Sequence, residues 1–345
     1  MRFQTSKCSF LVLFCWAAFP TTTSAHHSVA STFDTAQIEE IEGELIDVRW
    51  QNPHVSFAVR VMGAEGQAEL WDIETNSVSI MSRMDLSGDV FTLGDRVRVA
   101  GNPARAGGNM LYARNMQLQG MEEVLLAPGV GPRWSDVTLG TSERWRSEGS
   151  DSNDDNGIFR VWSTSFTVPM LIPRFAGNNY PLTRGAQRTA ESFDPANSPL
   201  LACNPKGMPT IMEQPYPMEF IDTGDTITLR LEEYDTVRTF DMTGQAIPAN
   251  PASTLLGHST GRWDQDTLVV TTTNANWPHV DAVGIPLSQL AEMVETFWLN
   301  QETSRLEYTL TITDPSVFTE PLELEKEWVW VPENTVEPYN CTVSN

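Results

Sequence analysis

Two adjacent histidines lie in the stretch TTTSAHHSVA, close to a point where an export signal is typically cleaved. If cleavage follows Ala25, His26 becomes the first residue of the chain and carries a free α-amine. An N-terminal histidine chelates a metal ion through its amine and ring Nδ1, and one more imidazole completes a three-nitrogen set that suits copper(II). The second imidazole is expected from His54 in the turn NPH, with His27 as the other candidate. We therefore expect a copper site formed by His26 and His54.

The residues around His54 fit this role. Pro53 fixes its own φ at about −65° and favours an extended Asn52, which restricts the direction of the next side chain. Asn52 could hydrogen-bond backbone or the outer nitrogen of a histidine ligand. Met81 and Met84 could offer soft axial sulfur, although packing in a core is the simpler explanation for both.

The alternative is that the histidines bind no metal. Fresh N-termini are commonly disordered, and Asn-Pro-His is an ordinary turn. Adjacent residues of an extended chain point to opposite sides, which makes His27 the weaker partner for His26. Zinc fits less well than copper, because no third and fourth protein ligand occurs at a familiar spacing.

A second group of candidate residues lies in GHSTGRWDQD. His258, Arg262 and Asp264 could serve a hydrolase or isomerase, provided that the three converge in one cleft. The alternative is that DQD is a hairpin turn and that these carboxylates are solvated. No G-x-S-x-G elbow, Walker loop, dinucleotide fingerprint or haem-attachment motif occurs in the sequence. We therefore favour a binding protein over an enzyme.

The first 25 residues have the three parts of a secretory signal. Arg2 and Lys7 supply positive charge, CSFLVLFCWAAF forms an apolar core, and Thr23 and Ala25 are the small residues before the cleavage point. The apolar run is shorter than the roughly 20 residues that span a bilayer, and no later segment approaches that length. The sequence thus predicts a soluble protein exported to the periplasm or beyond the cell.

Cysteine usage agrees with export. Of four cysteines, two lie in the expected signal, which leaves Cys203 and Cys341. In an oxidising compartment this pair is expected to form a disulfide. Closing so long a loop would stabilise the fold by about 4 kcal/mol in the chain-entropy model. The alternative is two buried free thiols.

The charge of the chain excludes one class of partner. The formal net charge is −23, and the sequence has no basic patch. Such a chain repels phosphate backbones, so we expect no nucleic acid partner. A metal ion or a small molecule is the expected ligand.

The hydrophobic pattern of the N-terminal part predicts an OB-fold-like, five-stranded barrel. Five segments alternate as strands, and one segment between the third and fourth strand has a helical pattern. This first domain is assigned to residues 26–120. The strands are expected at 41–50, 55–62, 68–75, 94–101 and 110–118, and the helix at 77–86.

The C-terminal part is expected to be an antiparallel meander, either a lipocalin-like barrel or a curved sheet. A polar, acidic run closes the range 121–156, which we interpret as a linker before a second domain at 157–345. Meander barrels commonly enclose a ligand, so a small-molecule carrier is the alternative function. A short helix is expected within 181–193, and strands at 226–235, 237–242, 262–274, 294–301, 306–314 and 326–332.

Several motifs resemble a known family. HHS at 26–28, W-x-NPHV at 50–55 and GDRVRVAG at 94–101 resemble uncharacterised exported bacterial proteins whose N-terminal module is a domain of unknown function. LEEYDTVRTFDMTGQAIP and GHSTGRWDQDTLVVTTTN resemble the C-terminal part of similar hypothetical proteins. The resemblance implies kinship and no particular activity. Several such relatives carry a basic residue where Gln245 stands here, so an anion-binding role is not expected at that position.

Overall fold

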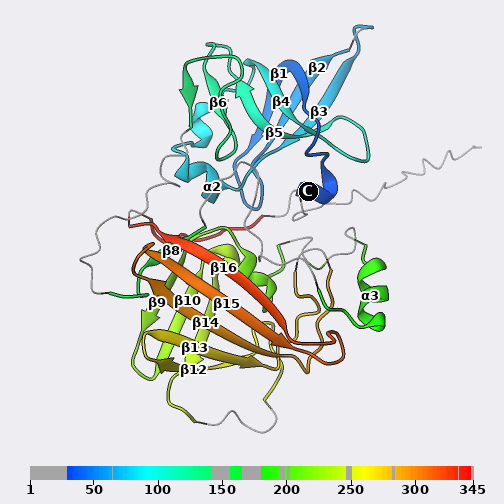
Figure 1. Cartoon of the computed structure of the whole chain (residues 1–345). Helices are drawn as coiled ribbons and strands as arrows, with labels where there is room; N and C mark the ends of the chain where they lie inside the picture. The colour runs from blue at the N-terminus through cyan, green and yellow to red at the C-terminus, as the bar shows by residue number, and fades with distance from the viewer. Residues whose placement is uncertain are drawn as a thin grey trace, which may run out of the picture.

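The chain folds into two β-barrels, a smaller one from its N-terminal part and a larger one from its C-terminal part (Figure 1). The computed structural model describes residues 29–63, 65–140, 156–164, 180–194, 199, 203–245, 251–281, 284–332 and 334–342, and our structural statements concern these residues. The expected signal at 1–25 and the histidines His26 and His27 lie outside them. The prediction of a mainly β fold is confirmed.

Five strands close the smaller barrel in the order β1-β2-β3-β5-β4, and β4 pairs back with β1. Helix α2 (Val78–Arg83) lies between β3 and β4 along the chain. This strand order and helix position are those of an OB-fold, as the sequence predicts. The strands are β1 (Glu39–Arg49), β2 (Ser56–Met62), β3 (Ala68–Glu74), β4 (Arg96–Pro103) and β5 (Met110–Gln117).

Alternation along each strand directs apolar side chains into this barrel. In β2, Phe57 and Val59 are fully buried, whereas Arg60 is exposed. Helix α2 begins where the Ser77 hydroxyl accepts a hydrogen bond from a backbone N–H of the first turn, which caps the helix. Met81 and Met84 lie in the same apolar core, so core packing accounts for both.

The range 121–156, expected as a linker, contains two further strands of the first sheet. β6 (Glu123–Leu125) pairs with β5, and β7 (Thr138–Leu139) pairs with β6. The buried Glu123 carboxylate accepts hydrogen bonds of 2.7–3.0 Å from the backbone N–H groups of Arg133, Trp134 and Ser135. These bonds attach the segment to the smaller barrel, and the domain boundaries stay a prediction.

Nine strands close the larger barrel in chain order from β8 to β16, and β16 pairs back with β8. The short helix α3 (Arg184–Glu191) lies within the range expected for it. The strands are β8 (Val161–Ser163), β9 (Met218–Asp222), β10 (Thr226–Leu231), β11 (Thr236–Asp241), β12 (His258–Asp264), β13 (Thr267–Thr273), β14 (Glu292–Asn300), β15 (Arg305–Thr313) and β16 (Leu322–Trp330).

This barrel differs from a pure antiparallel meander at one place. β11 and β12 run parallel, and every other neighbouring pair in the ring is antiparallel. The reason is geometric, since strands that alternate in direction close a ring only when their number is even. With nine strands, one pair must run the same way, and here it is β11 and β12.

Large side chains fill the inward positions of the larger barrel. Trp162, Phe220, Phe297, Tyr308 and Trp328 are each no more than 2% exposed. Four of these rings are in contact in turn, with centroids 5.2 Å apart for Phe220 and Phe297, 4.9 Å for Phe297 and Tyr308, and 5.3 Å for Tyr308 and Trp328. These side chains form a packed core of the kind that holds most small domains together.

A buried 3-10 helix, Thr210–Glu213, lies against the wall of the larger barrel and is held by Lys326 of β16. The Lys326 ammonium donates hydrogen bonds to the carbonyl oxygens of Met212 at 2.9 Å and Gln214 at 3.1 Å. Burial lowers the pKa of Lys326 to about 7. The amine is therefore close to losing its proton at neutral pH.

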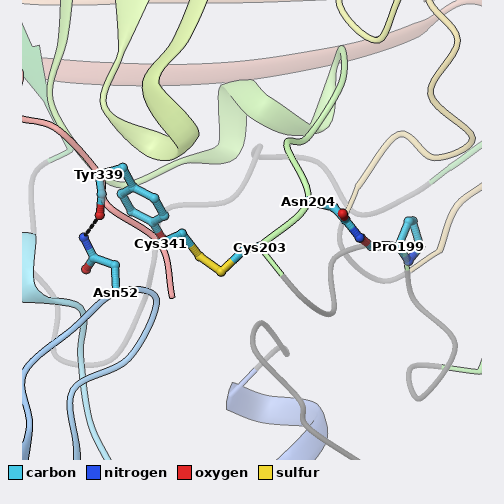
Figure 2. The surroundings of a disulfide bond; sticks show 6 residues. All are labelled: Asn52, Pro199, Cys203, Asn204, Tyr339 and Cys341. Atoms are coloured by element: carbon cyan, nitrogen blue, oxygen red, sulfur yellow. Dashed lines mark hydrogen bonds between the residues drawn. A yellow bond between two sulfur atoms is a disulfide. The ribbon is translucent and has the colours of Figure 1, made fainter. Parts of the chain in front are cut away.

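The two barrels share an apolar cluster. Tyr216 and Tyr339, which belong to the C-terminal part of the chain, pack into the core of the smaller barrel. Asn52 of the smaller barrel donates a hydrogen bond of 2.5 Å to the carbonyl oxygen of Tyr339. Figure 2 shows this bond beside the disulfide that joins Cys203 to Cys341, which confirms the predicted pairing. The C-terminal segment is thereby fixed both to the smaller barrel and to the connection between β8 and β9 of the larger one.

A buried ion pair also crosses between the barrels. The Arg83 guanidinium of α2 lies 3.1 Å from a carboxylate oxygen of Glu232. Burial lowers the pKa of Arg83 to about 10 and raises the pKa of Glu232. Both shifts are in the direction in which burial disfavours the charged form. The ion pair therefore joins the two barrels at a cost in desolvation free energy.

Removing one partner of this pair should destabilise the protein strongly. In Glu232→Ala, the Arg83 guanidinium stays buried without this counter-charge, and the free energy of unfolding should fall by about 3–5 kcal/mol. The double variant Arg83→Met, Glu232→Gln should recover most of that loss, because no buried charge remains. Urea unfolding of the three proteins measures both effects. A loss below about 1 kcal/mol in the single variant would show that the pair is solvated.

Lys326 should make folding stability depend on pH. An unfolded lysine has a pKa of about 10.4, so between about pH 7 and pH 10 the unfolded chain binds a proton that the folded chain does not. The free energy of unfolding that this group contributes therefore rises with pH through that window and is constant below it. Urea unfolding of the wild type and of Lys326→Met at several pH values measures this effect. From pH 7 to pH 10, the free energy of unfolding of the wild type should rise relative to that of the variant. A constant difference would contradict the lowered pKa.

Candidate functional sites

The first candidate site surrounds His54 at one end of the smaller barrel. His54 is half-buried, and its Nδ1 lies 3.0 Å from the carbonyl oxygen of Thr75. Because a carbonyl oxygen only accepts, Nδ1 carries the proton and the lone pair is on Nε2. A histidine whose outer nitrogen donates to a carbonyl is oriented as metal ligands commonly are.

Of the two partners expected for Asn52, backbone or the outer nitrogen of a histidine ligand, the structure shows backbone. The Asn52 side-chain oxygen accepts a hydrogen bond of 2.9 Å from the backbone N–H of Val78 at the start of α2. Its amide nitrogen donates to Tyr339, and the peptide bond to Pro53 is cis. Asn52 therefore ties the NPH turn to α2 and to the C-terminal segment, while Thr75 orients the imidazole.

Phe33, near the start of the described chain, and His54 both lie near Tyr112. Phe33 follows helix α1 (Val29–Thr32) and forms a bridge with Ala104. The Phe33 ring lies 5.5 Å from the ring of Tyr112, which in turn lies 6.5 Å from the His54 ring. One tyrosine side chain thus contacts both the first described segment and the candidate ligand.

The surroundings of Tyr112 are acidic. Burial, followed by the charge of Glu74, raises the pKa of Tyr112. Its hydroxyl stays protonated and donates a hydrogen bond of 3.1 Å to Asn76. Glu74 pairs with Tyr112 across the two parallel strands of the barrel. A negative charge near His54 favours a cation there, and Tyr112 itself is not expected to act as a ligand.

Within the described part of the chain, no three histidine, cysteine or carboxylate side chains are grouped as metal ligands. A copper site at His54 would therefore depend on His26 or His27, which lie outside the described residues. None of the described helices combines the length and the apolar character needed to cross a bilayer.

The second candidate site is a pocket of about 540 Å³ where the parallel strands β11 and β12 separate. Two aliphatic side chains contribute to its lining, and almost all the others are polar. Gly257 is in the left-handed region at φ +73°, and a Cβ there would lie 2.6 Å from the Thr273 carbonyl oxygen, so the turn before β12 requires glycine. The lining residues are Val237, Arg238, Thr239, Asp241, Gln245, Thr254, Leu256, Gly257, His258, Ser259 and Thr260.

The structure separates the residues that the sequence grouped around His258. His258 lines the pocket, and its Nε2 donates to the carbonyl oxygen of Ala252 at 2.7 Å. Arg262 and Asp264 lie on the exposed end of β12 and pair with each other at 3.4 Å. Four residues of strand place the Arg262 backbone about 13 Å from that of His258. The three side chains are therefore not brought into one cleft.

The floor of the pocket adjoins a buried polar network that the sequence analysis did not find. The Arg238 guanidinium donates to both carboxylate oxygens of Glu295, at 2.9 Å and 2.5 Å. Tyr308 donates to the same carboxylate at 2.9 Å, and Thr272 at 3.3 Å. Burial lowers the pKa of Arg238, but the charge and hydrogen bonds of Glu295 more than offset this, so its pKa is raised.

A signal for this network is present in the sequence. Glu295 in VETFWLNQ lies between Met293 and Phe297, and Arg238 in VRTFDM lies between Thr236 and Phe240, and all four of these neighbours are buried. A single charge in the inward register of an alternating strand must be paired, because an isolated buried ion is very costly. Two opposite charges of this kind predict one buried pair.

Neutralising Glu295 should therefore be costly. In Glu295→Gln, the fully buried Arg238 loses its counter-charge, and the free energy of unfolding should fall by about 3–5 kcal/mol. Tyr308→Phe removes one hydrogen bond from the same carboxylate and should cost only about 1–2 kcal/mol. Urea unfolding of the two variants checks the ranking, and equal losses would contradict it.

Comparison with known proteins covers only the N-terminal part of the chain. Residues 15–111 match a family described as a family of unknown function, DUF6152. The matched range contains His26, His27 and His54 and most of the smaller barrel. No curated protein and no solved structure matches the chain. The N-terminal part is thus similar to a family without an assigned activity, and the resemblance expected for the larger barrel stays a prediction.

Proposed function

We propose that this protein is an exported binding protein whose smaller barrel binds one copper(II) ion through the amine and imidazole of His26 and the imidazole of His54. One observation carries the proposal: the first described segment of the chain lies against Tyr112, which contacts His54. The described segment that follows His26 in the sequence and the candidate ligand His54 thus share one neighbour, which supports a site between them.

The proposal requires the three residues before Val29 to reach His54. His26 precedes Val29 by three residues, which extend over at most about 10 Å. Segment 29–33 is anchored by backbone hydrogen bonds, from Arg105 to Thr32 at 2.8 Å and from Asp34 to Pro103 at 2.8 Å. We propose that the anchored segment directs the His26 amine toward His54.

The chemistry of the site also supports copper. The Thr75 carbonyl fixes His54 in the tautomer that presents Nε2 to a metal. Glu74 adds negative charge beside Tyr112, which favours a divalent cation. Copper(II) accepts the planar nitrogen set that an amine and two imidazoles provide, and it has the highest affinity of the common divalent ions for such ligands.

Export remains part of the proposal. The charged, apolar and small-residue parts of 1–25 support a cleaved signal, and cleavage after Ala25 would create the amine that the site requires. The disulfide between Cys203 and Cys341 is compatible with an oxidising compartment. The periplasm is the compartment that we propose.

Copper(II) titration of the protein that begins at His26 tests the proposal. One ion should bind tightly and give a nitrogen-rich electron paramagnetic resonance spectrum. A matched protein with one alanine before His26 loses the amine chelate, and its affinity should fall by roughly 100-fold or more. His54→Ala should cause a similar loss.

His258→Ala is the control, because His258 lies in the larger barrel, away from the proposed site. This variant should bind copper as the unaltered protein does. Equal affinity of the native and alanine-extended proteins would overturn the proposal, since the amine would then contribute nothing. A loss in the extended protein with no loss in His54→Ala would replace His54 by another ligand.

A further inference from the structure

The parallel strands β11 and β12 pair over only part of their length. Two residue pairs are in register, Phe240 with Ser259 and Asp241 with Thr260. Before these pairs the strands separate, and the pocket lies between Val237–Thr239 on one side and residues 254–258 on the other. Among the described residues, Val237–Thr239 of β11 therefore pairs with a strand on one side, β10, and with none on the other.

The backbone of this stretch faces the pocket. β11 pairs with β10 in unbroken antiparallel register, and the Met242 N–H continues that ladder by donating to the Asp225 carbonyl at 2.9 Å. In an antiparallel ladder, alternate residues direct their N–H and C=O groups toward the partner strand. Met242, Phe240 and Arg238 thus face β10, and the backbone groups of Val237 and Thr239 face the pocket.

The Phe240–Ser259 pair uses the Thr239 carbonyl, but within the described residues no backbone hydrogen bond from the turn before β12 reaches the N–H groups of Val237 and Thr239. The turn before β12 satisfies its own backbone, because Gly257 N–H donates to the Thr254 carbonyl and the Thr254 hydroxyl donates to the Gly257 carbonyl. On the floor, Arg238 is fully buried, and within the described residues its Nε has no hydrogen-bond partner. Hydrogen-bonding groups thus line both the edge and the floor of the pocket.

We propose that the pocket binds a short extended peptide, which adds to the open edge of β11 as an extra strand. A peptide backbone offers alternating N–H and C=O groups at the spacing that Val237 and Thr239 present, which is the usual basis of strand addition. The pocket volume of about 540 Å³ lies in the range of sites for small ligands and suits a few residues. This proposal does not depend on copper binding.

Charge narrows the class of peptide. Asp241 lines the pocket, Glu295 neutralises Arg238 beneath it, and the whole chain carries a net charge of −23. An acidic peptide would be repelled, whereas uncharged or basic side chains would be tolerated or attracted. Val237 and Leu256 provide apolar contact for one face of the peptide.

A variant of Val237 tests the backbone contact directly. Val237→Pro removes the backbone N–H that faces the pocket. The Val237 side chain is 52% exposed, so the substitution does not remove a buried side chain. The preceding residue, Thr236, has φ −70° and ψ 133°, which is the conformation that a residue before proline prefers. Val237→Thr is the matched control, because it keeps both the N–H and the β-branched shape.

The probe is a library of acetylated, amidated tetrapeptides in which the two central positions carry every amino acid in turn. Binding is measured as changes in the amide chemical shifts of the full-length protein when each peptide is added. The best peptide should shift the amide signals of Val237 and Thr239. Its affinity should fall about tenfold or more in Val237→Pro and stay unchanged in Val237→Thr. A matching peptide with N-methylated central amides should bind about tenfold more weakly to the unaltered protein, which tests the same contact without any variant.

Three results would overturn the proposal. One is that no library member shifts these signals at millimolar concentration. Another is that the N-methylated peptide binds as well as its parent, because the backbone of the ligand would then not pair with β11. The third is that a mixture of free amino acids shifts the same signals equally, since the pocket would then take small molecules rather than peptides.

Discussion

Both barrels are closed by an odd number of strands, and this constraint places one parallel pair in each ring. In the smaller barrel the pair is β3 and β5, and in the larger barrel it is β11 and β12. Antiparallel neighbours can be joined by a tight hairpin, but parallel neighbours need a longer connection that crosses the barrel end. The parallel pairs are short, with three and two residue pairs in register, and the strands separate beyond them.

The two candidate sites lie at these parallel pairs. Glu74 and Tyr112 form the last register pair of β3 and β5, and Thr75, which orients His54, follows directly. Val237 and Thr239 lie just before the register pairs of β11 and β12. Where neighbouring strands separate, their backbone groups no longer pair with each other. These groups and the side chains beside them are then accessible to a ligand. The same topological constraint thus determines where both candidate sites lie.

The sequence predicts the parts of this arrangement that depend on local periodicity. The five strands of the smaller barrel, α2, α3 and the main strands of the larger barrel follow from alternation, and two cysteines leave one disulfide. β8 has only three residues, too few for a pattern, yet it closes the nine-stranded ring. The parallel pair, the Arg238–Glu295 network and the packing of Tyr339 into the smaller barrel arise from contacts between distant segments, which periodicity does not encode.

The contact between the barrels gives a physical reason for their presence in one chain. Asn52 lies two residues before His54 and is held on both sides, by the start of α2 and by Tyr339 of the C-terminal segment. That segment is in turn fixed by the disulfide to Cys203, which lies between β8 and β9 of the larger barrel. A metal ligand on an isolated turn would sample many orientations, and each would weaken a site with few ligands. Because the larger barrel holds the NPH turn from outside, the direction of His54 is set by the whole protein rather than by the turn alone.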